Sequence, residues 1–265
     1  MLELEFMQNA LLAGLLVALL APTVGLFIVL KRYSMIGDTL SHSTFAGVAI
    51  GLVLGLQPLL TAFVYTTICA IVIEFLRNYY KKYAEMVMSI ILTLSLGIAI
   101  MLVSSGKAPA NVNSYLFGSI LTVTKEDILM IFLVAITCFI IIFTLYDKLI
   151  YVTFDEEGAR TAGIRVGFIN YLFTVMVGAA ISVSIRVMGI LVISSVMVVP
   201  VATALQFKKG FKISLIISII VGLLDILLGL VLSYYLNSAP GGTIAVLSVL
   251  VLLITIIITN IIKKS

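Results

Sequence analysis

The sequence predicts an all-α membrane protein with eight or nine transmembrane helices that form one bundle per chain. Three observations predict this fold class. The 265 residues are 62% hydrophobic and 11% charged, and their mean hydropathy is +1.29. The apolar residues are grouped in runs of about 20, the length that an α-helix needs to cross a hydrocarbon core. Charged residues and Pro or Gly breaks separate these runs, as expected for a chain that crosses a membrane repeatedly.

The apolar runs locate the predicted spans. Following each run to its next charged, proline or glycine break gives nine segments: residues 10–30, 40–56, 59–76, 86–104, 127–146, 168–185, 187–207, 213–236 and 243–262. Eight spans are the alternative, because a re-entrant or broken pair is expected near Arg186 or near Gln57 and Pro58. We expect residues 1–265 to form a single transmembrane domain.

The basic residues predict the orientation of these spans. If the loop at Lys31 and Arg32 is cytoplasmic and the spans alternate, 13 of the 16 Lys and Arg residues fall on the cytoplasmic side. Only Lys107, Lys125 and Arg186 fall outside. This asymmetry favours nine spans, and it also accounts for the net charge of +4. The basic character therefore indicates membrane lipid as the surroundings and no nucleic-acid partner.

A short cytoplasmic helix is predicted at about residues 153–164, TFDEEGARTAGI. Thr153 and Glu156 have the spacing of a capping box, and the acids beside them suit the positive end of a helix. Gly163 is placed to end the helix. The segment is either a solvated connector or a surface that docks against another protein, since small residues such as Ala159 lie between its charges.

The stretch GDTLSHS, residues 37–43, contains the only histidine of the chain. Asp38 and His42 are four residues apart, so a helix places them on one face. A carboxylate and an imidazole suit a divalent transition metal, zinc especially. A second copy of the chain would double this pair to the four ligands that zinc accepts. The alternative is a helix-capping aspartate and a histidine bonded to a backbone carbonyl.

Two further charges are predicted to lie within or beside apolar runs, Arg186 and Asp225. A lone charge in a membrane is costly, so the two are expected to form a structural ion pair. A transport role for Asp225 is the alternative.

Five stretches together resemble one known family. They are MIGDTLSHSTFAGVAIGLVLG at 35–55, SYLFGSILTVT at 114–124, FDEEGARTAGI at 154–164, VMGILVISSVMVVPVATA at 187–204 and APGGTIAVL at 239–247. The chain resembles, over nearly its whole length, the permease subunits of ATP-binding-cassette importers for zinc and manganese.

This resemblance implies a multi-pass permease in the cell membrane of a prokaryote. It implies a homodimeric pore, cytoplasmic ATPase subunits and an extracytoplasmic metal-binding protein, with Asp38 and His42 as transient ligands of the transported zinc or manganese. The motif around these two residues looks more like the zinc branch, because Ala46 stands where manganese-type members tend to have proline. The segment expected to couple to the ATPase carries Phe154, Asp155, Glu156, Glu157, Ala159 and Gly163.

No permanently bound cofactor is expected, and ATP is expected on the partner subunit. The only Gly-Lys pair, Gly106-Lys107, continues with Ala108 and does not form a phosphate-binding GxxxxGK[ST] loop. The alternatives are manganese or iron import by the same machinery, import of iron chelates or cobalamin, and a cation carrier driven by an ion gradient. An intramembrane enzyme is disfavoured, because one histidine cannot form HExxH and no Gly-x-Ser-x-Gly motif occurs.

Overall fold

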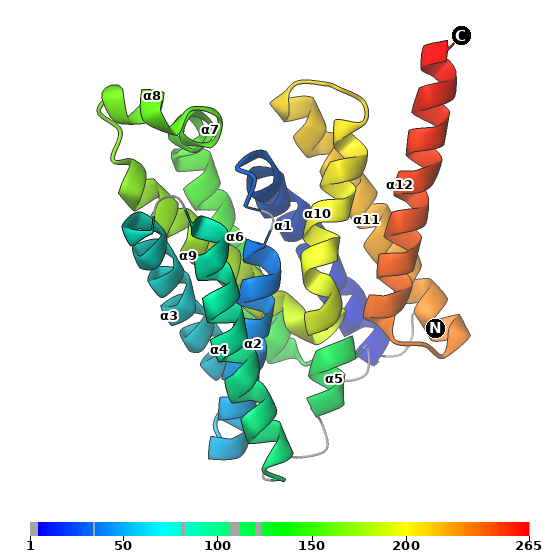
Figure 1. Cartoon of the computed structure of the whole chain (residues 1–265). Helices are drawn as coiled ribbons and strands as arrows, with labels where there is room; N and C mark the ends of the chain where they lie inside the picture. The colour runs from blue at the N-terminus through cyan, green and yellow to red at the C-terminus, as the bar shows by residue number, and fades with distance from the viewer. Residues whose placement is uncertain (1–4, 34, 81–82, 107–111, 120–122, 265) are drawn as a thin grey trace.

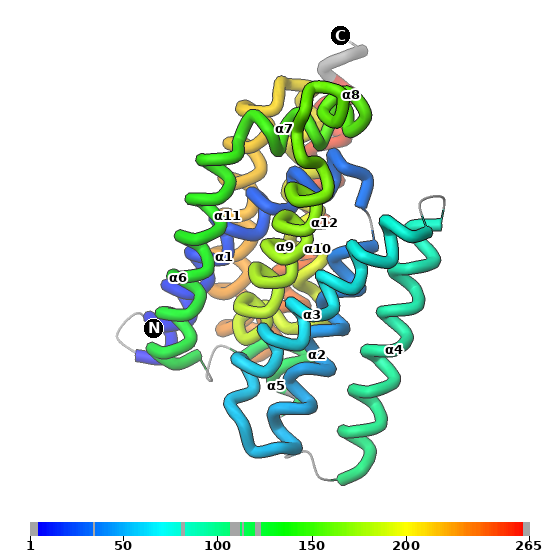
Figure 2. Tube along the Cα trace, turned by 90° about the vertical axis from the view of Figure 1, so that its left-hand side faces the viewer, coloured from blue at the N-terminus to red at the C-terminus, as the bar shows by residue number. Residues whose placement is uncertain are grey.

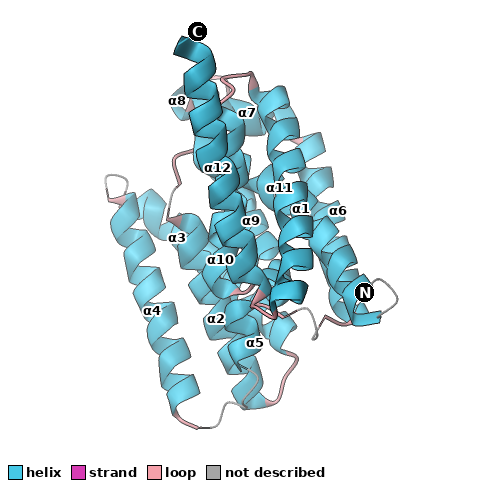
Figure 3. Cartoon of the chain, turned by 90° about the vertical axis from the view of Figure 1, so that its right-hand side faces the viewer, coloured by secondary structure: helices cyan, strands magenta, loops and turns pink. Residues whose placement is uncertain are grey.

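A computed structural model of the chain describes residues 5–33, 35–80, 83–106, 112–119 and 123–264 (Figure 1). Within these residues all regular structure is helical (Figure 3). The helices are α1 (Glu5–Leu30), α2 (Ile36–Leu54), α3 (Pro58–Tyr79), α4 (Ala84–Ser104), α5 (Val112–Phe117), α6 (Lys125–Thr144), α7 (Tyr146–Phe154), α8 (Glu156–Thr161), α9 (Val166–Met188), α10 (Ile190–Leu205), α11 (Phe211–Leu236) and α12 (Pro240–Lys264).

The long helices match the predicted spans one for one. Nine of the helices in the described part of the chain have 16 or more residues, and each overlaps one predicted apolar run. Seven of them are long and apolar enough to cross a membrane. The other two are α10, which has only 16 residues, and α2, which carries Asp38, His42 and four hydroxyl side chains. The predicted all-α polytopic membrane fold is confirmed, with seven to nine spans.

Helices α1 and α9 form the centre of the bundle. In each, 72% of the most apolar window is buried inside the chain, compared with 28% for α4 and α6 and 11% for α12. Helix α1 packs against α6, α9, α10 and α11, and the rings of Phe27 and Phe173 meet edge to face between α1 and α9. Helices α4 and α12 lie at the periphery (Figures 2 and 3). Their exposed apolar side chains suit contact with lipid.

The two ends of the bundle differ. Helices α7 and α8 and the end of α12 lie at one end, which we call the α8 end; α5 and the start of α12 lie toward the other, the α5 end (Figure 1). The start of α2 lies roughly level with the middle of α10 (Figure 1). Accordingly, Gly37 in α2 contacts Ser194, which lies within α10 rather than at its termini. Asp38 therefore lies within the depth of the bundle.

Three glycines pack at the α5 end, where the chain turns from α9 into α10. Gly189 alone separates the two helices, and its φ of 77° is one that glycine adopts readily. A Cβ atom on Gly189 would lie 2.5 Å from the backbone nitrogen of Gly118, and one on Gly241 would meet the carbonyl of Met188. This turn lies three residues after Arg186 and separates the two helices that match the predicted spans 168–185 and 187–207. Three of the five stretches that carry the resemblance meet at this junction, which gives them a structural role.

Candidate functional site

Helix α2 has one open face, and Asp38 and His42 lie on it. Gly37 faces α10, since a Cβ atom built on it would lie 3.2 Å from Cβ of Ser194. Thr39 faces α4 instead, because its Oγ1 lies 3.4 Å from a backbone carbonyl oxygen of that helix. Successive residues of an α-helix are rotated by about 100°. Asp38 is therefore directed between α10 and α4, and His42 lies about 40° further round on the same face.

Both side chains keep ligand-binding capacity that the chain itself does not use. The Asp38 side chain is exposed, and His42 is partly buried. Its Nδ1 is enclosed and has no hydrogen-bond partner among the described residues. Asp38 does not cap α2, because the N-cap is Met35 and no side chain caps this helix. The alternative expectation of a capping aspartate and a carbonyl-bonded histidine is therefore wrong.

The hydroxyl side chains of α2 are satisfied within the chain. Ser41 Oγ donates to the carbonyl of Gly37 at 2.7 Å, and Ser43 Oγ donates to that of Thr39 at 2.9 Å. Ser43 Oγ also lies 3.0 Å from the hydroxyl of Ser95 in α4. Such bonds to the preceding turn are the usual way for a helix to accommodate Ser and Thr in apolar surroundings. The open polar groups of α2 are thus concentrated at Asp38 and His42.

A carboxylate oxygen and a neutral imidazole nitrogen are ligands for divalent transition metals. Within the described part of one chain, no group of three or more His, Cys, Asp or Glu side chains could hold a metal ion. Asp38 and His42 can therefore supply only part of a coordination shell. Further ligands must come from water or from another molecule.

The segment expected to couple to an ATPase forms the α7–α8 turn. The predicted capping box is wrong, because α7 continues to Phe154 and the Thr153 hydroxyl bonds to the Leu149 carbonyl at 2.6 Å. Asp155 caps α8 instead, since its Oδ1 accepts from the backbone N–H of Gly158 at 2.8 Å. Glu156 and Glu157 occupy the first turn of α8 and are exposed, as is Phe154.

Gly163 ends this segment as predicted. Its φ is 81°, and its N–H donates to the carbonyl of Arg160 at 3.1 Å. The N–H of Ile164 donates to the carbonyl of Ala159 at 3.0 Å. These two bonds form a Schellman motif, in which glycine is favoured at the left-handed position. Ala159 is fully buried against the rest of its own chain, while the acidic side chains face outward.

The predicted ion pair between Arg186 and Asp225 is wrong. Arg186, in the last turn of α9, lies 3.4 Å from Oδ2 of Asp127 in the first turn of α6. Its guanidinium also lies 5.2 Å from the ring centroid of Tyr115 in α5. Asp225 in α11 is buried, and its Oδ2 accepts from the Ser248 hydroxyl of α12 at 2.6 Å. Arg186 therefore supports the α5 end, whereas Asp225 joins α11 to α12.

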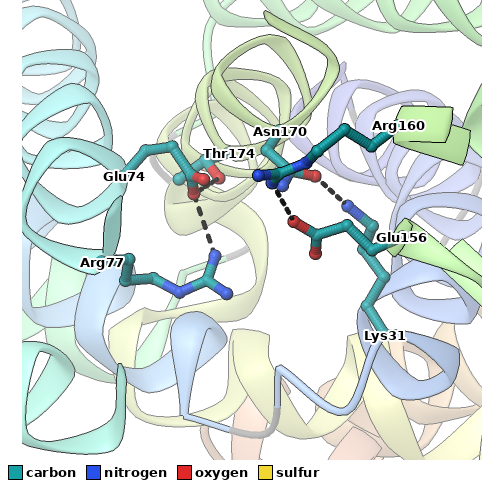
Figure 4. Close-up of polar contacts among 7 residues, drawn as sticks. All are labelled: Lys31, Glu74, Arg77, Glu156, Arg160, Asn170 and Thr174. Atoms are coloured by element: carbon teal, nitrogen blue, oxygen red, sulfur yellow. Dashed lines mark hydrogen bonds and ion pairs between the residues drawn. The ribbon is translucent and has the colours of Figure 1, made fainter. Parts of the chain in front are cut away.

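Sequence reasoning missed a set of charged and polar residues toward the α8 end (Figure 4). We call it the polar clamp: Lys31, Glu74, Arg77, Asn170 and Thr174. Glu74 Oε2 accepts from Arg77 Nη1 at 2.9 Å and from the Thr174 hydroxyl at 3.3 Å. Lys31 Nζ donates to Asn170 Oδ1 at 2.6 Å. The sequence did contain a signal for this set: an acid, Glu74, lies inside the apolar run 59–76, and an arginine follows three residues later.

Comparison with known proteins identifies the relatives of this chain. The profile of the ABC 3 transport family matches residues 3–259. A "probable metal transport system membrane protein" of Treponema pallidum is 45% identical over 98% of both chains. The "high-affinity zinc uptake system membrane protein ZnuB" of Buchnera aphidicola is 32% identical over 92% of this chain and 94% of its own. The "manganese import system permease protein ScaB" of Streptococcus gordonii is 28% identical over 97% and 92%.

A solved structure has the same fold. The structure titled "PsaBC from Streptococcus pneumoniae in complex with Fab" superposes with a TM-score of 0.85 at 29% identity, covering 96% of this chain and 92% of that one. The relatives named for zinc and for manganese transport are similarly distant, so similarity alone favours neither ion.

Proposed function

Because this chain belongs to the ABC 3 transport family and is a membrane-embedded permease of a divalent-metal importer, we propose that Asp38 and His42 bind the transported ion. The observation that carries this proposal is the state of the two side chains in the isolated chain. An exposed carboxylate and an imidazole nitrogen that has no partner among the described residues lie on one helix face, next to Gly37, which faces the interior of α10 at Ser194. Unsatisfied polar groups at such a position are costly unless a ligand uses them.

The missing ligands are supplied by a second copy of the chain. If two copies face each other across the open side of α2, the site gains a second carboxylate and a second imidazole. Four such ligands complete the tetrahedral shell that zinc prefers. The open face between α4 and α10 is the surface that this arrangement requires, and it is the face on which Asp38 lies.

Zinc is the ion that this ligand set fits best. Imidazole nitrogen suits zinc, whereas manganese prefers shells of carboxylate, carbonyl and water oxygens. Manganese or iron import by the same machinery is the alternative. Competition decides between them: excess manganese should leave the uptake of trace zinc nearly unchanged, whereas excess zinc should suppress it.

The exposed α7–α8 turn is the docking surface for the ATPase subunit, which binds ATP and hydrolyses it. Phe154, Asp155, Glu156 and Glu157 are exposed and available to this partner, while Gly163 and the buried Ala159 fix the turn in its shape. An extracytoplasmic metal-binding protein delivers the ion at the α5 end. The permease contributes the route and the ligands.

The test is zinc uptake by the complete transporter in proteoliposomes containing the permease, its ATPase and its binding protein. Asp38→Ala and His42→Ala should each reduce ATP-dependent uptake by more than about 100-fold, since loss of even second-shell support of a metal site costs 10–100-fold. Glu85→Ala is the matched control, because Glu85 is an exposed acid in the first turn of α4. Normal uptake by both Asp38→Ala and His42→Ala would remove the proposed site.

A further inference from the structure

The connection between α1 and α2 leads directly to Asp38, and its backbone holds an unusual conformation. Arg32 has a φ of 58°, a left-handed value that costs energy for a residue other than glycine. The N–H of Tyr33 donates to the carbonyl of Ile28 at 3.0 Å. The N–H of Arg32 also donates to the carbonyl of Val29 at 3.1 Å, so Arg32 holds the left-handed position of a Schellman motif that ends α1. Side chains that contact this helix end can therefore act on the start of α2.

Two side chains of the polar clamp hold the connection from outside it. The guanidinium of Arg77 in α3 lies 3.9 Å from the ring centroid of Tyr33, a close cation–π contact. Lys31 is held by Asn170 of α9 at 2.6 Å (Figure 4). Arg77 is itself fixed by Glu74, only 2% of whose side chain is exposed. A movement of Arg77 would therefore change its contact with the ring of Tyr33, which lies five residues before Asp38 in the chain.

The other side of Arg77 faces the α7–α8 turn across a polar cavity of about 650 Å³. Helix α8 contributes Glu156, Glu157 and Arg160 to its lining, and α3 contributes Glu74 and Arg77. Glu156 pairs within α8, with Arg160 at 3.5 Å. Because a cavity rather than packed side chains separates the two helices, α8 has room to approach α3.

The chemistry across this cavity is complementary. The Arg77 guanidinium has five N–H donors, of which one is given to Glu74, and Arg77 lines the cavity. The carboxylates of α8 are acceptors. The charge of Glu156 already acts on the connection, because burial lowers the pKa of Lys31 to about 8 while the charges of Glu74 and Glu156 oppose that shift.

We propose that Arg77 is a positioning residue that couples α8 to Asp38. When the ATPase displaces α8 toward α3, a carboxylate of Glu156 or Glu157 approaches the Arg77 guanidinium, which lines the cavity, and the guanidinium shifts its contact with Tyr33. The start of α2, and with it Asp38, moves in response. This inference rests on the proposed function, because it assigns a regulatory link to the same ion site.

The test measures zinc transport and ATP hydrolysis together in the complete reconstituted transporter. Arg77→Met should lower the zinc transported per ATP by about tenfold, within the usual range of coupling energies. ATP hydrolysis and equilibrium zinc binding should stay close to wild type. Tyr33→Leu, which removes the ring that Arg77 contacts, should show the same uncoupling, whereas Arg77→Lys should retain part of the coupling. Lys209→Met, an exposed basic residue between α10 and α11, is the control.

Three results separate the explanations. Normal transport per ATP in Arg77→Met, or in Tyr33→Leu, overturns the inference and leaves the ion site intact. A parallel fall of hydrolysis and zinc binding in Arg77→Lys and in Tyr33→Leu means that the clamp is only structural, which also overturns it. Absence of metal uptake by the unmodified transporter would instead contradict the proposed function.

Discussion

The open face of α2 and the polar clamp both carry ionisable groups, but the two regions differ in whether these groups have partners in the same chain. In the clamp, Glu74 is buried and its Oε2 accepts two hydrogen bonds, and Lys31 has a partner in α9. On α2, Asp38 is exposed and His42 Nδ1 is enclosed without a partner among the described residues. Each clamp charge has a partner within one chain, so these charges support the structure and its movement. The α2 pair is incomplete, so it is available to a ligand.

This contrast predicts opposite effects on stability. Glu74→Ala should lower the free energy of unfolding by about 3–5 kcal/mol, because it leaves the Arg77 guanidinium buried without its counterion. Asp38→Ala should change it by less than about 0.5 kcal/mol, since the side chain is exposed and unpaired. Thermal unfolding of the detergent-solubilised permease without metal measures both. A large loss of stability in Asp38→Ala would mean that Asp38 belongs to the structure rather than to the site.

The clamp also predicts a dependence of stability on pH. Burial lowers the pKa of Lys31 from its usual 10.5 to about 8 in the folded chain, so between these values the unfolded chain binds the proton and the folded chain does not. Stability contributed by this group therefore rises with pH across this window, by up to about 1.4 kcal/mol per unit, and is constant below it.

The matched variant isolates this effect from other groups that titrate at alkaline pH. Lys31→Met should remove the rise, so the difference in unfolding free energy between wild type and variant should change steadily from pH 8 to pH 9.5. A difference that does not vary with pH would show that Lys31 titrates normally and that the clamp does not enclose its charge.

Local signals in the sequence predicted most of the fold and the shared helix face of the two candidate site residues. Apolar runs located the long helices, because in lipid the length and hydropathy of a segment largely determine whether it spans. The spacing of Asp38 and His42 placed them on one face, since helix geometry alone fixes it. Gly163 was predicted to end the helix because the residue that follows a helix is often left-handed, a conformation that glycine favours.

The features that the sequence did not predict depend on contacts between distant segments. Arg186 pairs with Asp127 rather than Asp225 because the end of α9 lies beside the start of α6. Thr153 does not cap α8 because α7 extends through it, which pairs its hydroxyl with the preceding turn. Glu74 was missed because one acid within a strongly apolar run does not alter the predicted span. Its importance emerges only in the structure, where the Thr174 hydroxyl of α9 donates to it in addition to Arg77.

The most direct test of the central claim is the stoichiometry of zinc bound at equilibrium to the purified complex of permease and ATPase, measured without ATP and without the extracytoplasmic metal-binding protein. The account predicts one zinc ion for every two permease chains, with an X-ray absorption spectrum that contains imidazole nitrogen. It also predicts loss of that ion in Asp38→Ala and in His42→Ala. One zinc per chain, or unchanged binding in either variant, would contradict a site formed by Asp38 and His42 of two copies.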